Sequence, residues 1–200
     1  VPGVSSGDAI KVIEEVAAET LPVGYGYEFS GITREEQSTG ANTTVIIFAL
    51  CLVFVYLLLS AQYESYILPL AVILSIPFGL AGSFIFAQMM SVENNIYLQI
   101  ALIMLVGLLA KNAILIVEFA LDRRKTGMSI VDSAIQGAAA RLRPILMTSL
   151  AMVIGLLPMM FAHGVGANGN STLGTGAVGG MFIGMVCQIF IVPALFVIFE

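Results

Sequence analysis

Three long stretches of the sequence contain no charged residue. No Asp, Glu, Lys or Arg occurs between Glu36 and Glu64, between Glu64 and Glu93, or between Arg143 and Glu200. Each stretch holds at least one apolar segment of about 20 residues, the length at which a helix crosses about 30 Å of hydrocarbon. The composition of the 200 residues, 58% hydrophobic and 10% charged, is also too apolar for an ordinary soluble domain. The predicted fold class is mainly α, a polytopic membrane helix bundle.

The bundle is predicted to contain five transmembrane helices. They cover about residues 42–61, 66–88, 96–122, 143–162 and 172–199. Five of the eight Lys and Arg residues lie between the third and fourth spans, at Arg123, Arg124, Lys125, Arg141 and Arg143. The positive-inside rule places this loop in the cytoplasm. Alternation of the spans then places residues 1–40 outside the membrane and the C-terminus inside.

The same loop carries a helical pattern. Its apolar residues recur at helical spacing, at Ile130, Ala134, Ile135 and Ala138. This pattern predicts a short amphipathic helix over about residues 128–141, lying along the membrane surface. The fourth span is predicted as a separate helix that follows it.

Residues 1–40 are soluble in character. Apolar residues at helical spacing predict a helix over roughly residues 7–20, and Pro22 ends it. The alternating segment Tyr25–Phe29 predicts a short strand, and polar residues 33–40 lead to the first span. A helix followed by a strand indicates the end of an α+β subdomain whose other strands lie elsewhere. We therefore expect the sequence to be an internal piece of a larger protein.

Lys111 lies near the middle of the third span, within GLLAKNAILIVEFA. A cation near the bilayer midplane costs about 2.5–3.5 kcal/mol even on insertion scales, and it usually faces a partner inside a helix bundle. Two interpretations stay open: a titrating or ion-paired group in a proton relay, which is favoured for intramembrane charges, or a structural ion pair. The neighbouring Asn112 is able to hydrogen-bond across a helix interface, which is more often packing than chemistry.

A buried lysine needs an anion. Glu118 is seven residues from Lys111, about two helical turns or roughly 10 Å along the same helix. That separation is too large for a direct ion pair. The expected partner of Lys111 is a carboxylate on a helix outside this sequence.

Arg141 and Thr148 stand in RLRPILMTSL, at the start of the fourth span. An arginine at this depth either anchors the helix at the membrane interface or takes part in function, and the residues alone do not decide between the two. Thr148 either bonds the carbonyl of its own helix four residues earlier, which the residues alone favour, or serves as a hydroxyl in a proton path.

Small residues recur at the start of the last span. Gly176, Gly180 and Gly184 form two consecutive small-xxx-small pairs, a spacing that permits close helix packing and implies no chemistry.

Several function classes have no support in the sequence. No phosphate-binding loop and no serine, cysteine or zinc constellation occurs, so neither an enzyme activity nor a cofactor is expected. No basic stripe suggests nucleic acid as a partner. The ten methionines and the single His163 form no evident ligand set, and we expect most methionines to fill the core or face lipid.

Four segments together are similar to one family. GLLAKNAILIVEFA, RLRPILMTSLAMVIGLLP, GTGAVGGM and AQYESYILPL resemble the resistance-nodulation-division (RND) efflux transporters, especially the hydrophobe/amphiphile branch that exports drugs from Gram-negative bacteria. The resemblance extends over essentially the whole sequence. It implies the C-terminal part of a chain with twelve spans, of which the eighth to the twelfth are present. Residues 1–40 would then end a periplasmic α+β porter subdomain.

The resemblance also implies a mechanism and partners. Lys111 would pair with two adjacent aspartates on an absent span, Thr148 would be the relay threonine, and Arg141 would lie on the cytoplasmic side of the proton path. The whole protein would be a homotrimer in the inner membrane that exchanges protons for amphiphilic small molecules, together with a periplasmic adaptor and an outer-membrane channel. A metal-exporting relative, a non-transporting relative with a structural lysine pair, and a static membrane scaffold remain as alternatives.

Overall fold

The chain divides into two compact units, Val1–Thr43 and Thr44–Glu200. The computed structural model describes residues 6–22, 24–31, 33–34, 41–92, 94–164 and 167–200. Most of the predicted polar link, residues 35–40, lies outside these ranges. The two units are described separately, and the assignment of the first to a periplasmic subdomain stays a prediction.

The first unit contains helix α1, Ser6–Thr20, followed by an extended segment. The strand predicted at Tyr25–Phe29 is wrong for this chain, because residues 25–30 have no regular secondary structure. A strand needs a neighbouring strand for its backbone hydrogen bonds, and none of the residues described in this unit provides one. The aromatic side chains of the segment stay largely uncovered, with Tyr25 74% and Tyr27 48% exposed.

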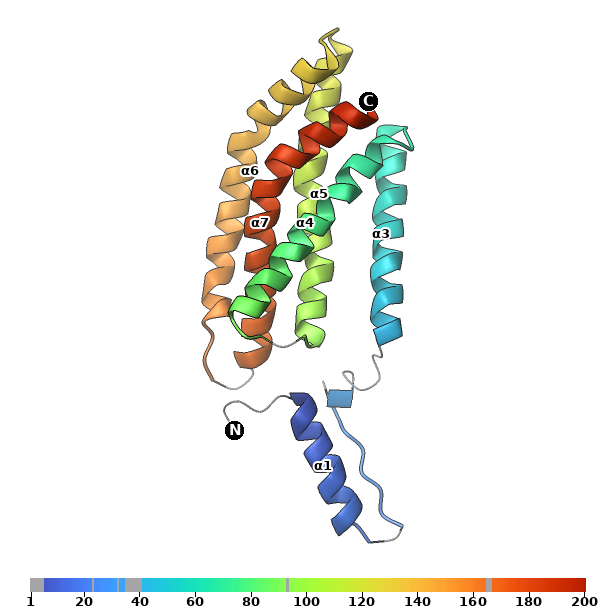
Figure 1. Cartoon of the computed structure of the whole chain (residues 1–200), viewed down its shortest axis with the longest axis vertical. Coiled ribbons are helices and arrows are strands. Elements are labelled where there is room, and N and C mark those ends of the chain that lie inside the picture. Colours follow the sequence, from blue (N-terminus) through green and yellow to red (C-terminus); the bar gives the residue numbers. More distant parts are fainter. Residues whose placement is uncertain (1–5, 23, 32, 35–40, 93, 165–166) are drawn as a thin grey trace. The chain divides into compact units, whose positions relative to one another are not determined.

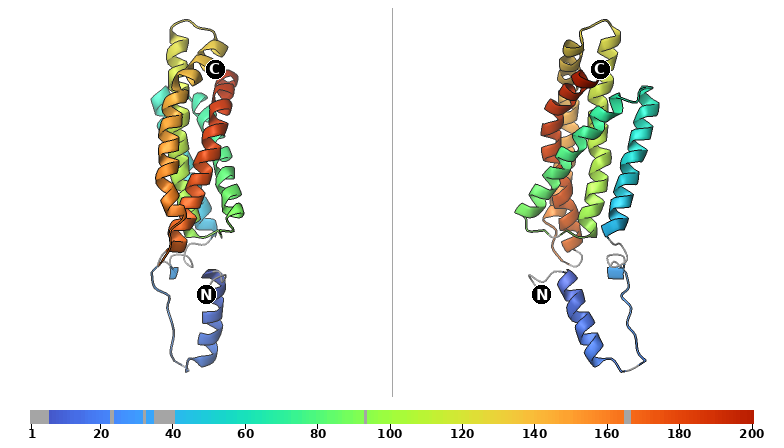
Figure 2. Two further views of the ribbon diagram at one scale, coloured as in Figure 1. Left: turned by 90° about the vertical axis from the view of Figure 1, so that its left-hand side faces the viewer. Right: turned by 45° about the vertical axis from the view of Figure 1, so that its right-hand side comes forward.

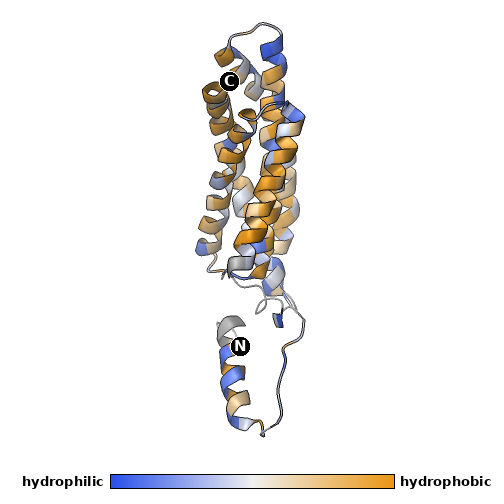
Figure 3. Cartoon of the chain, turned by 90° about the vertical axis from the view of Figure 1, so that its right-hand side faces the viewer, coloured by the Kyte–Doolittle hydropathy of each residue, from blue (hydrophilic) through white to orange (hydrophobic). Residues whose placement is uncertain are grey.

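The second unit is built from helices α3, α4, α5, α6 and α7 (Figure 1). Their bounds are Ala41–Tyr63, Leu68–Met89, Ile96–Lys125, Ile130–Met160 and Ala167–Phe199. All five are long and apolar enough to cross a membrane, which confirms the five predicted spans. Apolar residues cover these helices along most of their length (Figure 3).

Helix α6 differs from the prediction. The expected surface helix at 128–141 and the expected span at 143–162 form one continuous helix, Ile130–Met160. Pro144 lies inside it without ending it, although a proline removes one backbone hydrogen bond and usually kinks a helix. The preceding alanines at 138–140 favour helix strongly. Ser129 caps the start, where its hydroxyl accepts a hydrogen bond from the Asp132 amide at 3.1 Å.

Helix α7 packs against three other helices. It contacts α4, α5 and α6, and the views in Figure 2 show it between α4 and α6. Glycines permit this close approach: a Cβ added at Gly184 would lie 3.1 Å from the Gly79 Cα, and one at Gly176 would lie 2.7 Å from the Leu98 Cδ1. The predicted small-residue positions Gly176, Gly180 and Gly184, called the glycine seam below, thus lie in a tight contact of α7 with α4 and α5.

Helix α3 is bound less closely than the others. Most of its apolar side chains are exposed, and Leu59 is its buried exception. Hydrogen bonds join its two ends to α5: the Thr44 hydroxyl donates to the Gln99 Oε1 at 2.9 Å, and the Tyr63 hydroxyl donates to the Ile114 carbonyl at 3.3 Å. Helices α4 to α7 therefore make the packed core of the unit.

Candidate functional site

Lys111 occupies an exposed position in the middle of α5. Its neighbours Ala110, Asn112 and Ala113 are buried, so the lysine faces away from the packed side of the helix. Among the described residues no carboxylate lies within ion-pair distance of its ammonium group. An uncovered cation at the centre of a span requires further chain or water around it, because hydrocarbon solvates charge poorly.

A buried hydrogen bond between α5 and α6 fixes the position of Lys111 along the helix axis relative to α6. The Asn112 Nδ2 donates to the Ser149 Oγ at 3.0 Å, and both side chains are almost fully buried. Asn112 thus bonds across a helix interface. Lys111 and Thr148 each precede one of the two bonded residues, in helices that run in opposite directions. They therefore lie about 3 Å apart along the helix axes.

Thr148 is exposed and bonds its own helix. Its hydroxyl lies 3.0 Å from the Pro144 carbonyl oxygen and 3.2 Å from that of Ile145, so one proton is shared between two acceptors. This is the local bond that the residues alone favoured. A hydroxyl oxygen also accepts hydrogen bonds. The Thr148 oxygen therefore keeps an acceptor available on the side where Lys111 lies exposed.

Arg141 is half-buried and precedes Thr148 by seven residues, about two helical turns, in α6. Its guanidinium carbon lies 4.6 Å from the centre of the Phe119 ring, and that of Arg123 lies 5.3 Å from the same centre. The Arg141 Nε is buried and has no hydrogen-bond partner among the described residues. Helices α5 and α6 are antiparallel (Figure 1), so Phe119 and Arg141 lie about 10 Å from the Lys111 level, toward the α5–α6 loop.

Among the described residues, no hydrogen bond or ion pair joins the predicted relay residues to one another. Lys111, Thr148 and Arg141 lie along the seam between α5 and α6, on a side that the described helices leave largely open. Such a stripe combines a cation, a hydroxyl and a second cation. It lacks an acid to exchange protons with them.

Glu118 lies elsewhere, in an open hollow at the ends of α3 and α5. The hollow has a volume of about 360 Å³ and is lined by Gln62, Tyr63, Glu64, Glu118, Leu121, Asp122 and Lys125. Glu118 therefore joins other carboxylates there. Across the searched part of the chain, no group of three or more His, Cys, Asp or Glu residues is arranged to hold a metal ion.

Gln188 is a buried polar residue that was not predicted from the sequence. Gln188 of α7 is 1% exposed, and its Nε2 donates to the Ser75 Oγ of α4 at 3.1 Å and to the Leu109 carbonyl of α5 at 3.0 Å. The available signal was an amide inside the apolar run CQIFIV. A single amide changes the mean hydropathy of a span very little, although the bonds of Gln188 join three helices.

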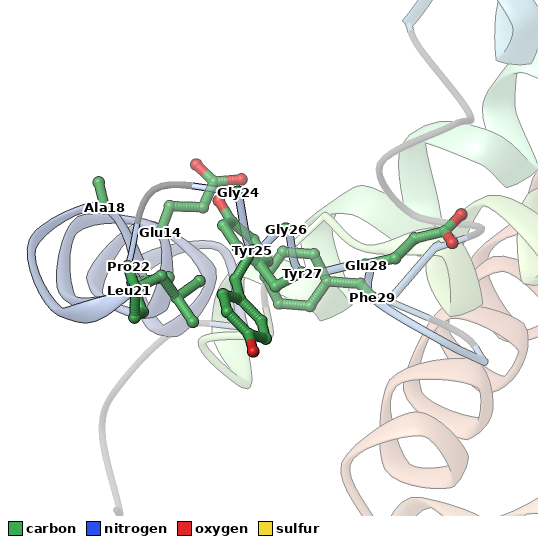
Figure 4. A pocket seen from close by; sticks show the side chains of 11 residues that line it. Glu14, Ala18, Leu21, Pro22, Gly24, Tyr25, Gly26, Tyr27, Glu28 and Phe29 are labelled. Carbon is green, nitrogen blue, oxygen red and sulfur yellow. The ribbon is translucent and has the colours of Figure 1, made fainter.

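The first unit has a hollow of its own, shown in Figure 4. It has a volume of about 590 Å³ and lies between α1 and the extended segment. Leu21 and Pro22 line one part, and Tyr25, Tyr27 and Phe29 line another. The Tyr27 and Phe29 rings meet edge to face at 5.6 Å. Glu14 and Glu28 also line the hollow, so its lining mixes polar and apolar groups, and it resembles an incompletely covered core.

Comparison with known proteins decides the family. The model of the AcrB/AcrD/AcrF family matches residues 1–200. The chain belongs to this family. The toluene efflux pump membrane transporter TtgB of Pseudomonas putida is 43% identical over 196 residues, which cover 98% of this chain. The multidrug resistance protein MdtF and the multidrug export protein AcrF, both of Escherichia coli, are 42% and 41% identical over 99% and 98% of it.

The matches confirm the resemblance to RND multidrug efflux transporters. The aligned part makes up 18% of TtgB and 19% of MdtF and AcrF, so this AcrB/AcrD/AcrF family chain spans less than a fifth of these relatives. Their remaining length is sufficient to hold further spans.

Proposed function

We propose that the chain is the C-terminal part of a proton-driven efflux pump that exports drugs or other amphiphilic compounds by proton/substrate antiport. The observation that carries the proposal is Lys111, which is exposed at mid-span and has no carboxylate within ion-pair distance among the described residues. Thr148 lies near its level in α6, and Arg141 lies nearer the α5–α6 loop. A cation in this position needs water or further chain around it, and a carboxylate on another helix would both cover and neutralise it. The names of the relatives, which describe solvent and multidrug efflux, support the direction of transport.

The proposed proton step takes place at the open face of α5 and α6. Carboxylates on an absent span neutralise Lys111 when they are ionised, and protonation of those carboxylates releases the ammonium group. The released ammonium then donates to a new acceptor, for which the Thr148 oxygen lies at the right level. Arg141, held on Phe119, supplies positive charge nearer the loop. The change of partner shifts the spans against each other.

The proposed setting is the inner membrane of a Gram-negative bacterium. The Arg123, Arg124 and Lys125 cluster at the end of α5 supports a cytoplasmic α5–α6 loop, which puts residues 1–40 in the periplasm and the C-terminus in the cytoplasm. The partners are two further copies in a homotrimer, a periplasmic adaptor and an outer-membrane channel. In this proposal the whole protein acts as a transporter, and no enzyme activity is expected of this chain.

The test is Lys111→Ala in the full-length pump, with Lys125→Ala as the matched control. We expect Lys111→Ala to abolish drug efflux while expression and trimer assembly persist, because the proton step loses its cation. Lys125 lies at the end of α5, outside the relay stripe, so its replacement is expected to leave efflux near the wild-type rate. Unchanged drug resistance in Lys111→Ala would refute the relay.

A further inference from the structure

Gln188 makes an unusual set of bonds for a residue inside a span. Its amide nitrogen uses both protons, one toward Ser75 of α4 and one toward the Leu109 carbonyl of α5. The Ser75 hydroxyl passes its own proton to the Val72 carbonyl at 2.6 Å. One side chain of α7 thereby connects two other helices, which lie beside it in Figure 1.

The bond to α5 falls two residues before Lys111. Two residues correspond to a turn of about 200° around a helix, so Leu109 and Lys111 lie on nearly opposite sides. Leu109 is 0% exposed against α7, and Lys111 is exposed. On the other side of Lys111, Asn112 bonds to Ser149 of α6. The segment that carries the lysine is therefore bonded directly to two helices, α7 and α6, within one turn, and through Gln188 it is linked to α4.

Gln188 also carries a cost. Its Oε1 is buried and has no hydrogen-bond partner among the described residues. A buried polar atom without a partner destabilises a fold, and an apolar side chain of similar size would avoid this. The adjoining helices already pack closely through glycines at 79 and 184. Simple packing therefore does not explain an amide at this position.

We propose that Gln188 is a positioning residue for Lys111. Its two hydrogen bonds fix the rotation of α5 about its own axis, so that Lys111 is held toward the carboxylates of the absent span. Without them α5 is able to turn or slide by a fraction of an ångström against α7, and the ammonium group moves away from its partner. This inference rests on the proposed proton relay.

Few other charged residues lie close enough to Lys111 to mask the effect of a rotation of α5. Helices α3, α4 and α7 contain no Asp, Glu, Lys or Arg. Helix α6 carries Asp132, Arg141 and Arg143, all nearer the α5–α6 loop than the Lys111 level, and α5 itself carries Glu118 and the residues that follow it. A change in the rotation of α5 is therefore expressed mainly through Lys111.

The experiment uses Gln188→Met in the full-length pump, reconstituted in vesicles with an imposed proton gradient and a fluorescent amphiphilic substrate. Methionine keeps the length of the side chain and loses both hydrogen bonds. We expect turnover per folded trimer to fall about five- to tenfold, the factor for two intramembrane hydrogen bonds of average strength. A carboxylate that loses a nearby cation binds its proton more readily, so the midpoint of the pH profile of efflux should rise by about half a unit.

Two further variants separate positioning from general packing. Thr175→Val removes a fully buried hydroxyl of α7 that has no partner among the described residues, and it should leave the pH midpoint unchanged. Ser75→Ala removes one acceptor of Gln188 and spares the bond to Leu109, so it should give a smaller shift in the same direction. Ser75→Ala also keeps the inference testable if Gln188→Met fails to fold.

The outcomes distinguish this inference from the proposed function. If Lys111→Ala abolishes efflux while Gln188→Met and Ser75→Ala keep the wild-type pH midpoint, the role of Gln188 is refuted and the relay stands. If Lys111→Ala still transports, the relay is refuted and the role of Gln188 fails with it. A shift of the same size in Thr175→Val would show general loosening of α7 and would also overturn the inference.

Discussion

The tightest point of the glycine seam gives the sharpest test of the packing. A Cβ added at Gly180 would lie 2.2 Å from the Leu105 Cδ1 and 3.0 Å from the Gly79 carbonyl oxygen. Ordinary carbon contacts begin at about 3.5 Å, so the leucine must withdraw by more than about 1 Å. Leu105 is 0% exposed and has no open space to enter, and the Gly79 carbonyl belongs to the α4 backbone. Gly180→Ala therefore forces α7 away from both α4 and α5.

Overpacking of this kind costs about 1–3 kcal/mol. The better helix propensity of alanine offsets at most about 1 kcal/mol of that loss. For a unit of this size, 1 kcal/mol corresponds to about 2–4 °C in the unfolding midpoint. The net loss of up to about 2 kcal/mol predicts that Gly180→Ala lowers the thermal unfolding midpoint of this unit, measured in the full-length pump in detergent, by up to about 8 °C.

Gly155→Ala in α6 is the matched control. A Cβ at Gly155 meets no described atom within 4 Å, so the same substitution there should leave the midpoint equal or slightly higher. Equal losses at Gly180 and Gly155 would show that the seam is not tight. A midpoint for Gly180→Ala at or above the wild-type value would refute the packing argument as well.

Two further predictions concern the relay stripe. Thr148→Ala should reduce proton-coupled efflux without blocking membrane insertion, and Thr148→Ser should restore it; efflux equal to wild type in the alanine variant would leave Thr148 with only its bonds to its own helix. Phe119→Leu removes the ring beneath Arg141 and Arg123, so it should destabilise the unit by about 0.5–2 kcal/mol in thermal unfolding. An equal loss in a background that lacks both arginines would exclude the cation–π contact as the cause.

The spans were predictable because their signal is local. A run of about 20 apolar residues has few alternatives to a membrane helix, and the five predicted segments match five helices. The errors in the predicted secondary structure occur where contacts between distant parts of the chain determine it. A surface helix over 128–141 and a separate fourth span were predicted, yet α6 continues from one into the other as a single helix. The strand at Tyr25–Phe29 needs a partner strand, which none of the described residues supplies.

The site was predictable in part for the same reason. An uncompensated lysine at mid-span is visible in the sequence, and so is an asparagine able to bond across an interface. The partners of these residues depend on how helices pair. Nothing near Asn112 in the sequence indicates Ser149, and nothing near Phe119 indicates that Arg141 stacks on it. Gln188 was missed because one amide hardly changes the hydropathy of a span.

The two sides of α5 explain why a costly lysine persists in this helix. On one side Ala101, Leu105 and Leu109 are fully buried against the other helices, and Gln188 adds a bond to the backbone. That side is complete within the chain. The other side presents the exposed Lys111, and in the proposed relay a carboxylate on a further span would offset the desolvation cost of its charge. Close packing of the buried side of α5 fixes the position of the helix, and this in turn holds the Lys111 charge on the exposed side in a defined place. In the proposed relay, docking of further spans and neutralisation of Lys111 would be the same event, and protonation of the docked carboxylates would loosen the contact that they created.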